Sequence, residues 1–155
     1  MKKLILGFTA AFALFGMTSA AHAIDTDFGV KAGQYSVDGD DTAATTAGLV
    51  YTLDLVGIVG VEFEANTTLS DGDFGGVDYS ATQLGAYGVL MTPGPIYFKG
   101  KAGFNYADID IGGVSDNDSN LAYGIGVGAF GFELEYTRTE FNEADVDFLS
   151  LSFKF

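Results

Sequence analysis

The chain has 155 residues, of which 48% are apolar and 14% aromatic, so it is long enough for one folded domain and too apolar for intrinsic disorder. It contains no cysteine and one histidine, His22, and its formal net charge is -14. A charge this negative argues against nucleic acid as a partner, because phosphate binding requires clustered Lys and Arg.

Residues 1–23 have the pattern of a secretory signal peptide. Two lysines precede an apolar run that ends near Met17, and the cleavage-type sequence Ala21-His22-Ala23 follows. The run is shorter than the about 20 apolar residues that a transmembrane helix needs. We therefore expect a cleaved signal peptide over residues 1–23 and a single domain over residues 24–155.

The predicted domain holds neither histidine nor cysteine, because His22 leaves with the signal peptide. This excludes Ser–His and Cys–His nucleophile pairs and any metal site built on imidazole or thiolate. It also excludes disulfide bonds, so packing and hydrogen bonding must hold the fold. We expect no enzyme activity, no catalytic residue, no metal site and no cofactor.

Alternation of apolar and polar residues with period two recurs along the predicted domain, and no segment shows a convincing helical apolar stripe. The fold class that this pattern predicts is all-β. We expect eight strands, at about residues 27–36, 44–53, 58–69, 78–91, 96–106, 120–130, 131–141 and 146–155.

The predicted connections alternate strictly between short and long. In an up-and-down antiparallel barrel, this places every tight turn at one end and every long loop at the other. The long connections lie at residues 38–41, 70–77, 107–119 and 142–145. Fourteen acidic residues lie in or beside them, so this end should be strongly negative: Asp38, Asp40, Asp41, Asp71, Asp73, Asp78, Asp108, Asp110, Asp116, Asp118, Glu140, Glu143, Asp145 and Asp147.

The polar faces of the strands carry four glutamates and four lysines, whereas the connections are almost uniformly acidic. Balanced opposite charges are typical of an enclosed interior, because buried charge must be paired. We therefore predict that these side chains form an ion-pair network in the lumen of a barrel, which is a better explanation of the paired glutamates than acid–base catalysis. The network comprises Lys31, Glu62, Glu64, Lys99, Lys101, Glu133, Glu135 and Lys154.

The strand at residues 120–130 has apolar side chains on one face and Ala122, Gly124, Gly126 and Gly128 on the other. We predict that the glycines leave room for long charged side chains from the two neighbouring strands. A glycine that merely weakens or bends the strand is the alternative. The pattern leaves open which face of the strand at residues 78–91 is inside.

The apolar faces then point to lipid. Eight strands close into a barrel without a free edge, and strands of about 9 to 11 residues match a tilted crossing of the bilayer. If the faces were reversed, the eight charges would lie in lipid. The free-energy cost would be as much as about 2 to 4 kcal/mol for each lysine near the midplane. The alternative is a soluble secreted barrel of the lipocalin kind, with an apolar interior and a polar exterior.

The chain resembles the eight-stranded outer membrane barrels of the OmpA/OmpX-like superfamily. The resemblance rests on the signal segment, the eight alternating strands and the final strand FLSLSFKF, which ends at Phe155. A terminal phenylalanine preceded by apolar residues at alternate positions, among them Phe153, is similar to the signal read by the barrel-insertion machinery. The resemblance implies a transmembrane β-barrel in the bacterial outer membrane, with tight turns and both termini toward the periplasm and acidic loops outside.

We expect an envelope-structural or surface-interaction protein with a filled lumen. The alternative is a narrow porin-like channel for small solutes, although eight inward charges leave little open bore. Expected partners are outer membrane lipid and lipopolysaccharide, the barrel-insertion machinery and a surface ligand of the loops; we expect a monomer. The acidic segments at residues 108–113 and 116–120 lack the later ligands of an EF-hand, so a solvated acidic rim is expected, with divalent cations bridging it to lipid headgroups as the alternative.

Overall fold

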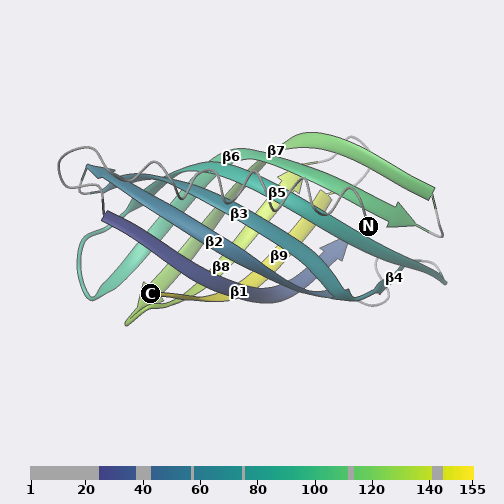
Figure 1. Ribbon diagram of the computed structural model, residues 1–155, viewed down its shortest axis with the longest axis horizontal. Helices are drawn as coiled ribbons and strands as arrows, with labels where there is room; N and C mark the ends of the chain where they lie inside the picture. The colour runs from purple at the N-terminus through teal and green to yellow at the C-terminus, as the bar shows by residue number, and fades with distance from the viewer. Residues whose placement is uncertain (1–24, 38–42, 57, 75, 112–113, 141–144) are drawn as a thin grey trace.

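An antiparallel β-sheet that closes on itself makes up most of the described chain (Figure 1). The computed structural model describes residues 25–37, 43–56, 58–74, 76–111, 114–140 and 145–155, so the predicted signal peptide lies outside the described residues. The strands are β1 (Asp25–Val37), β2 (Ala44–Val56), β3 (Val59–Ser70), β4 (Gly72–Phe74), β5 (Val77–Met91), β6 (Ile96–Ile111), β7 (Val114–Ala129), β8 (Phe132–Glu140) and β9 (Asp145–Lys154). Among the residues described, no helix is long and apolar enough to cross a membrane.

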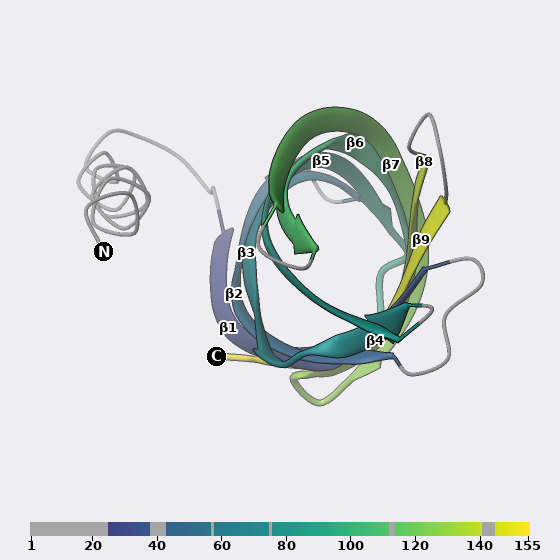
Figure 2. The same cartoon turned by 90° about the vertical axis from the view of Figure 1, so that its right-hand side faces the viewer.

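The sheet closes because its two ends meet. Hydrogen-bonded neighbours follow the order β3-β2-β1-β9-β8-β7-β6-β5, and β3 also pairs with β5. The short β4 pairs with the start of β5 and extends the wall beyond the end of β3, so eight strands form the barrel. Seen from its end, the barrel is a closed ring of strands (Figure 2). The predicted all-β, eight-stranded antiparallel up-and-down barrel is confirmed.

The register of the strands determines their tilt. A row of paired residues that leaves β1 at residue 25 passes once around the barrel and returns to β1 at residue 35, ten positions further along. It runs through Asp25, Asp54, Gly60, Val89, Lys101, Gly124, Thr137, Phe148 and Tyr35. With about 3.3 Å per residue and about 4.8 Å between strands, this stagger corresponds to a tilt of about 40°. Each residue therefore advances about 2.5 Å along the barrel axis.

Two predicted connections are wrong in extent. The sequence predicts a loop over residues 107–119, whereas β6 continues to Ile111 and β7 begins at Val114. The two strands pair residue for residue up to this tip. The physical reason is that the apolar–acidic alternation continues through the sequence ADIDI at the end of β6, which is a strand pattern. The connection predicted at residues 70–77 likewise contains β4, which pairs with the first residues of β5.

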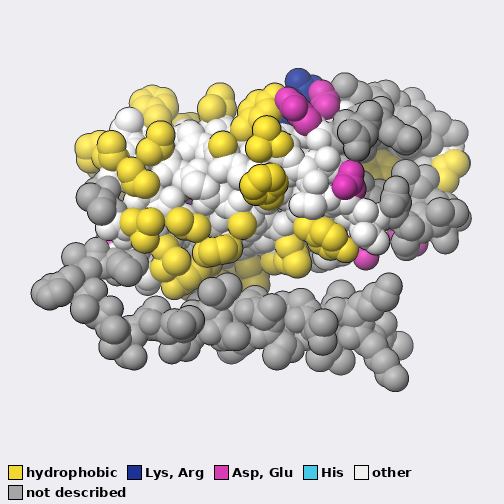
Figure 3. Space-filling model, turned by 90° about the horizontal axis from the view of Figure 1, so that it is seen from above, with side chains coloured by type: hydrophobic (Ala, Val, Ile, Leu, Met, Phe, Trp, Pro, Cys, Tyr) yellow, Lys and Arg dark blue, Asp and Glu magenta, His cyan; other side chains and the backbone are white. Residues whose placement is uncertain are grey.

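The barrel is polar inside and apolar outside. On β8, Phe132 is 53% exposed and Leu134 is 49% exposed, whereas their neighbours Glu133 and Glu135 are each 1% exposed. The same alternation is present on the other barrel strands, and hydrophobic side chains cover the outer wall (Figure 3). The lipocalin-like alternative requires an apolar interior and is therefore wrong.

The apolar outer belt is as tall as the apolar band of a membrane barrel. On β6 the outward positions run from Ile96 to Tyr106 without a charge, and Asp108 is the next residue of the same parity. Ten positions at about 2.5 Å each give about 25 Å, which matches the apolar band of outer-membrane barrels. Lys99 and Lys101 lie near the middle of this span on the inward face. The lumen charges therefore lie near the centre of the belt.

Candidate functional site

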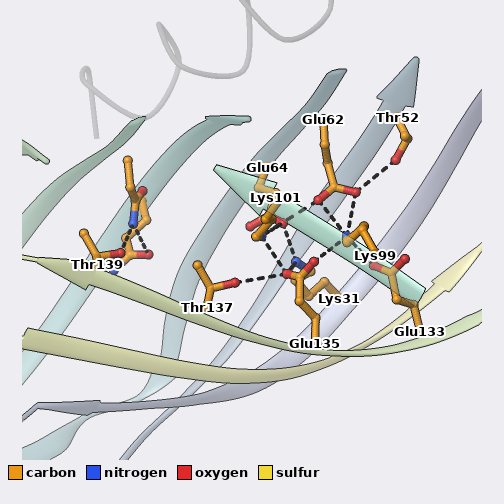
Figure 4. A network of polar contacts seen from close by, with 12 residues as sticks. Lys31, Thr52, Glu62, Glu64, Lys99, Lys101, Glu133, Glu135, Thr137 and Thr139 are labelled. Carbon is orange, nitrogen blue, oxygen red and sulfur yellow. Dashed lines mark hydrogen bonds and ion pairs between the residues drawn. The ribbon is translucent and has the colours of Figure 1, made fainter. Parts of the chain in front are cut away.

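All eight predicted lumen residues meet inside the barrel, and Figure 4 labels seven of them. Their contacts cross the lumen because they come from five strands. Each is at most 8% exposed: Lys31 on β1, Glu62 and Glu64 on β3, Lys99 and Lys101 on β6, Glu133 and Glu135 on β8, and Lys154 on β9. We call this group the charged layer.

Lys99 bridges opposite walls of the barrel. Its Nζ lies 2.9 Å from Glu62 Oε1 on β3 and 2.6 Å from Glu133 Oε1 on β8, and it also contacts Glu135. Thr52 on β2 donates its hydroxyl to the second oxygen of Glu62 at 3.1 Å. One ammonium therefore holds three carboxylates, a geometry that satisfies the charge of a fully buried lysine.

Lys31 and Lys101 share two glutamates. Lys31 Nζ lies 2.5 Å from Glu64 Oε1 and 2.8 Å from Glu135 Oε1, and Lys101 Nζ lies 2.6 Å from the same two oxygens. The four side chains form a closed ring of alternating charge. Thr137 donates a further hydrogen bond to Glu135 at 3.2 Å. Glu135 thus contacts three of the four lysines, and Glu62 also contacts three, Lys99, Lys101 and Lys154.

Lys154 completes the charged layer toward the tight-turn end. Its Nζ lies 3.1 Å from Glu62 Oε2 and 3.1 Å from Glu133 Oε2. The hydroxyl of Tyr97 donates to Glu133 Oε2 at 2.8 Å. Every charge of the charged layer therefore has an opposite partner, and the four lysines and four glutamates sum to zero.

Glycines on β7 lie beside these contacts. Gly126 lies between Lys99 on β6 and Glu135 on β8 in the register of the sheet. A Cβ atom at Gly124 would lie 2.6 Å from the carbonyl oxygen of Tyr136, closer than real Cβ contacts. At Gly128 it would lie 2.1 Å from the ring of Tyr97. Charged side chains are also near: a Cβ atom at Gly124 would lie 3.2 Å from Lys101 Cε, and one at Gly126 would lie 3.6 Å from Lys99 Cε, which is an ordinary contact. That the glycines leave room for charged side chains stays a prediction.

Sequence reasoning misses the neutral part of the lumen. On β5, which the sequence leaves unoriented, Gln83 and Tyr87 are buried inside and Leu84 and Leu90 are exposed outside. The ammonium of Lys101 lies 4.1 Å from the centre of the Tyr87 ring, a cation–π distance. Because apolar residues occupy both faces of β5, the alternation of polar and apolar residues does not indicate which face of this strand is inside.

A neutral polar layer and an aromatic cluster fill the lumen toward the long-loop end. Asn105 donates to Gln83 Oε1 at 3.0 Å and to Thr139 Oγ1 at 3.2 Å, and Tyr35 donates its hydroxyl to Gln83. Beyond them, a buried cluster consists of Tyr35, Ala44, Tyr79, Val146 and Phe148. Buried side chains therefore lie in the lumen at two further levels, the neutral layer and the aromatic cluster.

Three glutamates of the charged layer have the spacing of a metal site. Oxygens of Glu62, Glu133 and Glu135 lie within 4.8 Å of one another. Each of these carboxylates already binds lysine ammonium groups, so a cation would have to displace Lys99, which contacts all three. The arrangement is suited to charge neutralisation rather than to metal binding.

A second polar group lies outside the barrel. Arg138 is the only Lys or Arg of the described chain outside the lumen, and its Nε lies 3.0 Å from Asp147 and 3.7 Å from Asp145. Tyr136 donates to Asp147 at 2.7 Å, and Tyr123 donates to Glu140 at 3.1 Å. In Figure 3 a small group of Lys or Arg and Asp or Glu side chains borders the hydrophobic surface.

The predicted acidic connections are described only in part. Asp38, Asp40, Asp41 and Glu143 lie outside the described residues. Asp108 and Asp110 lie on β6, and Asp116 and Asp118 lie on β7.

The two phenylalanines of the predicted insertion signal lie at the seam where β9 meets β1. Phe155 and Phe28 exchange backbone hydrogen bonds of 2.8 and 3.2 Å, and their ring centroids are 5.6 Å apart. Phe153 lies 4.9 Å from Phe132, measured between ring centroids. Recognition of these residues by the insertion machinery stays a prediction.

Solved structures that resemble this fold include small outer membrane proteins. Ail, the attachment invasion locus protein of Yersinia pestis in complex with the heparin analogue sucrose octasulfate, is 18% identical; the match covers 84% of this chain and 96% of Ail, with a TM-score of 0.52. Neisserial surface protein A is 14% identical, with 83% and 94% covered and a TM-score of 0.54. OprG from Pseudomonas aeruginosa is 14% identical, with 85% and 97% covered and a TM-score of 0.57. No protein-family model and no curated protein matches the chain. The chain therefore has the eight-stranded antiparallel barrel fold of these small outer membrane proteins.

Proposed function

We propose that this protein is an integral protein of the bacterial outer membrane, with a lumen closed to solutes and a role at its acidic outer end. The observation that carries the proposal is the charged layer. Each of its eight charges has an opposite charge within 3.1 Å, and the layer lies near the centre of the apolar belt. The protein is then an envelope-structural or surface-interaction protein and not an enzyme.

Closure of the lumen follows from the energetics of buried charge. A permeating ion would have to separate lysines from glutamates that are almost fully buried. Removing one partner from a buried pair costs about 3 to 5 kcal/mol. The neutral layer and the aromatic cluster would also have to open before a solute reached the outer end. These barriers favour a closed barrel over the narrow pore.

The outer membrane location is supported by the apolar exterior, the belt of about 25 Å, the edge-free wall and the likeness to outer membrane proteins of the same fold. The signal-peptide pattern at residues 1–23 supports export across the inner membrane. Lipid and lipopolysaccharide would contact the belt, and the insertion machinery would read Phe153 and Phe155. A closed wall needs no second subunit to satisfy its backbone, which supports a monomer.

The chemistry of the outer end favours cationic over anionic ligands. A sulfated molecule such as the heparin analogue in the Ail complex is not expected to bind here. Arg138, the only Lys or Arg of the described chain outside the lumen, is paired with Asp147 and Asp145. The acidic residues at this end would repel sulfate groups.

Single-channel recording in a planar lipid bilayer tests closure directly. We expect the purified barrel to show no steady conductance. Lys99→Ala serves as an opening variant, because it removes a side chain that contacts Glu62, Glu133 and Glu135. Glu140→Gln is the control, because Glu140 is exposed on the same barrel and outside the charged layer.

If the unmodified protein shows a steady conductance that changes with Lys99→Ala and not with Glu140→Gln, the closed-barrel proposal is wrong. The narrow channel is then the better description of the lumen. Location is tested separately by fractionation. The protein should remain with outer membranes until detergent is added, and release by salt or alkali alone would contradict the proposal.

A further inference from the structure

The tight-turn end of the barrel is apolar up to its turns. The sequence runs that contain the three tight connections have no charged residue: residues 55–61, 79–98 and 119–132. Large apolar side chains at or beside these turns are exposed: Leu55, Ile58, Ile96 and Phe130. The outward surface at this end therefore lacks the charged border that the belt has at the long-loop end.

The aspartates at the tight-turn end lie on the inner side of the wall. Asp25 and Asp27 share the parity of the buried Lys31 on β1. Asp54 shares the parity of the buried Thr52 on β2, and it pairs with Asp25 in the register of the sheet. These charges line the mouth of the lumen and leave the outward side chains free to contact lipid.

The turn between β7 and β8 is continuous with the apolar belt. The belt on β6 starts at Ile96, the first residue of that strand, and Ile96 pairs with Ala129. Phe130 follows Ala129 directly. The backbone N–H of Lys154 donates to the carbonyl of Gly131 at 2.7 Å, so this turn lies at the same end as the C-terminus (Figure 1). Phe130 therefore extends the lipid-facing wall to the tip of the turn.

The turn between β5 and β6 exposes few backbone donors. It contains both prolines of the chain, Pro93 and Pro95, which have no backbone N–H. The hydroxyl of Thr92 accepts the N–H of Phe98 at 2.9 Å, and the N–H of Thr92 donates to the carbonyl of Phe98 at 2.9 Å. Such a turn suits surroundings with little water, because an unpaired backbone group is costly there.

Phe130 has a backbone conformation that is unfavourable for phenylalanine. Its φ is 54° and that of Gly131 is 85°, so both residues of this two-residue turn have positive φ. Asn, Asp and Gly are the usual residues at such positions, because other side chains crowd a left-handed backbone. The side chain of Phe130 is 84% exposed, the highest value for a large apolar residue of the described chain. Contacts within the described chain therefore do not offset the strain.

We propose that Phe130 is a membrane anchor, which inserts with the neighbouring tight turns into the inner leaflet and fixes the depth of the barrel. Its partner is the boundary between phospholipid headgroups and acyl chains, where aromatic rings of membrane barrels gather. Burial of the ring in this boundary offsets the left-handed backbone. The proposal rests on the proposed function, because only a membrane-spanning barrel has a lipid-facing wall.

A single tryptophan reports the depth of the turn, because the chain has no tryptophan of its own. Phe130→Trp is refolded in phospholipid vesicles whose acyl chains are brominated either close to the headgroup or near the chain end. Iodide on both sides of the membrane is the aqueous quencher. The controls are Leu134→Trp, at an outward position inside the belt, and Asp118→Trp, at an exposed position beyond it.

We expect lipid brominated close to the headgroup to quench Phe130→Trp more strongly than lipid brominated near the chain end. For Leu134→Trp the order should be reversed. Iodide should quench Phe130→Trp at least about threefold less than Asp118→Trp, because the ring lies at the headgroup and acyl-chain boundary.

Phe130→Asn separates the anchor from the turn. Asparagine suits a positive φ, so the change should stabilise a turn that is free in water. If lipid covers Phe130, loss of the ring outweighs this gain, and the unfolding equilibrium constant in vesicles should rise about fivefold. The matched control is Leu69→Asn, because Leu69 is exposed on β3 two positions beyond the exposed Thr67; its effect should be less than about twofold. Circular dichroism checks that each variant is folded.

Equal iodide quenching of Phe130→Trp and Asp118→Trp would overturn the proposal, as would a gain in stability with Phe130→Asn. Protection from iodide without quenching by brominated lipid would also overturn it and would indicate contact between two copies. If Leu134→Trp is not quenched by brominated lipid either, the proposed membrane location fails. Quenching of Leu134→Trp alone leaves that location intact and refutes only the anchor.

Discussion

Replacing Glu135 with glutamine tests whether the charged layer stabilises the barrel. The change leaves four lysines facing three glutamates, because Glu135 contacts Lys31 at 2.8 Å, Lys101 at 2.6 Å and also Lys99. Breaking a buried ion pair costs about 3 to 5 kcal/mol. Each of the three lysines still contacts another glutamate, so the cost should lie at the lower end of this range. We expect a loss of about 3 kcal/mol from a total unfolding free energy of about 5 to 15 kcal/mol.

Equilibrium unfolding by urea in phospholipid vesicles measures this loss. Circular dichroism is the suitable signal, because the chain contains no tryptophan. Glu140→Gln on the same strand is the control: Glu140 is exposed, and the change should cost less than about 0.5 kcal/mol. Adding Lys101→Met to Glu135→Gln restores neutrality and should recover at least about 1 kcal/mol. If the unfolding free energy of Glu135→Gln lies within about 0.5 kcal/mol of that of the unmodified protein, the reasoning is refuted. It is also refuted if the loss in the double variant equals the sum of the losses caused by Glu135→Gln and Lys101→Met alone.

Three further changes test other parts of the barrel. Gly124→Ala should lower the unfolding free energy by about 1 to 3 kcal/mol in the same urea assay, because its Cβ would meet the carbonyl of Tyr136. Gly100→Ala is the control and should be tolerated, because a Cβ there would have nothing within 4 Å. Equal losses for the two variants would contradict the steric account. Leu134→Arg should cost about 2 to 4 kcal/mol in vesicles if this outward position lies near the bilayer midplane, and a neutral effect there would contradict the lipid-facing assignment. Phe155→Ala should lower the amount of heat-modifiable barrel in outer membrane fractions severalfold. The same change should lower the unfolding free energy of the refolded protein by only about 1 kcal/mol. Normal assembly of this variant in cells would contradict a role of Phe155 as an insertion signal.

The alternation of residues is enough to predict the strands and the faces of most of them. Glu133 and Glu135 alternate with apolar neighbours, and a period of two leaves only one choice, which face is inside. The balance of lysine and glutamate then decides that choice, because a paired set of charges suits an enclosed interior. The eight residues of the charged layer follow from these two steps.

The pairing of individual charges could not be predicted, because it depends on the stagger of the closed sheet. Lys31 meets Glu135 across 104 positions of sequence, and only the ten-residue offset around the barrel brings their strands into that register. The inward side chains of β5 escaped prediction for another reason. Tyr87 is buried against the ammonium of Lys101, a contact that polarity along one strand does not reveal.

The burial of the lysines makes residues 25–155 of the folded protein nearly unreactive toward reagents that attack side-chain amines. All four lysines of residues 25–155 have their ammonium groups in the charged layer, with side chains at most 6% exposed. Trypsin likewise meets one basic side chain on the outer surface of the described barrel, Arg138. Labelling of lysine side chains within residues 25–155, or tryptic cleavage after these lysines, would therefore count the molecules that have not folded.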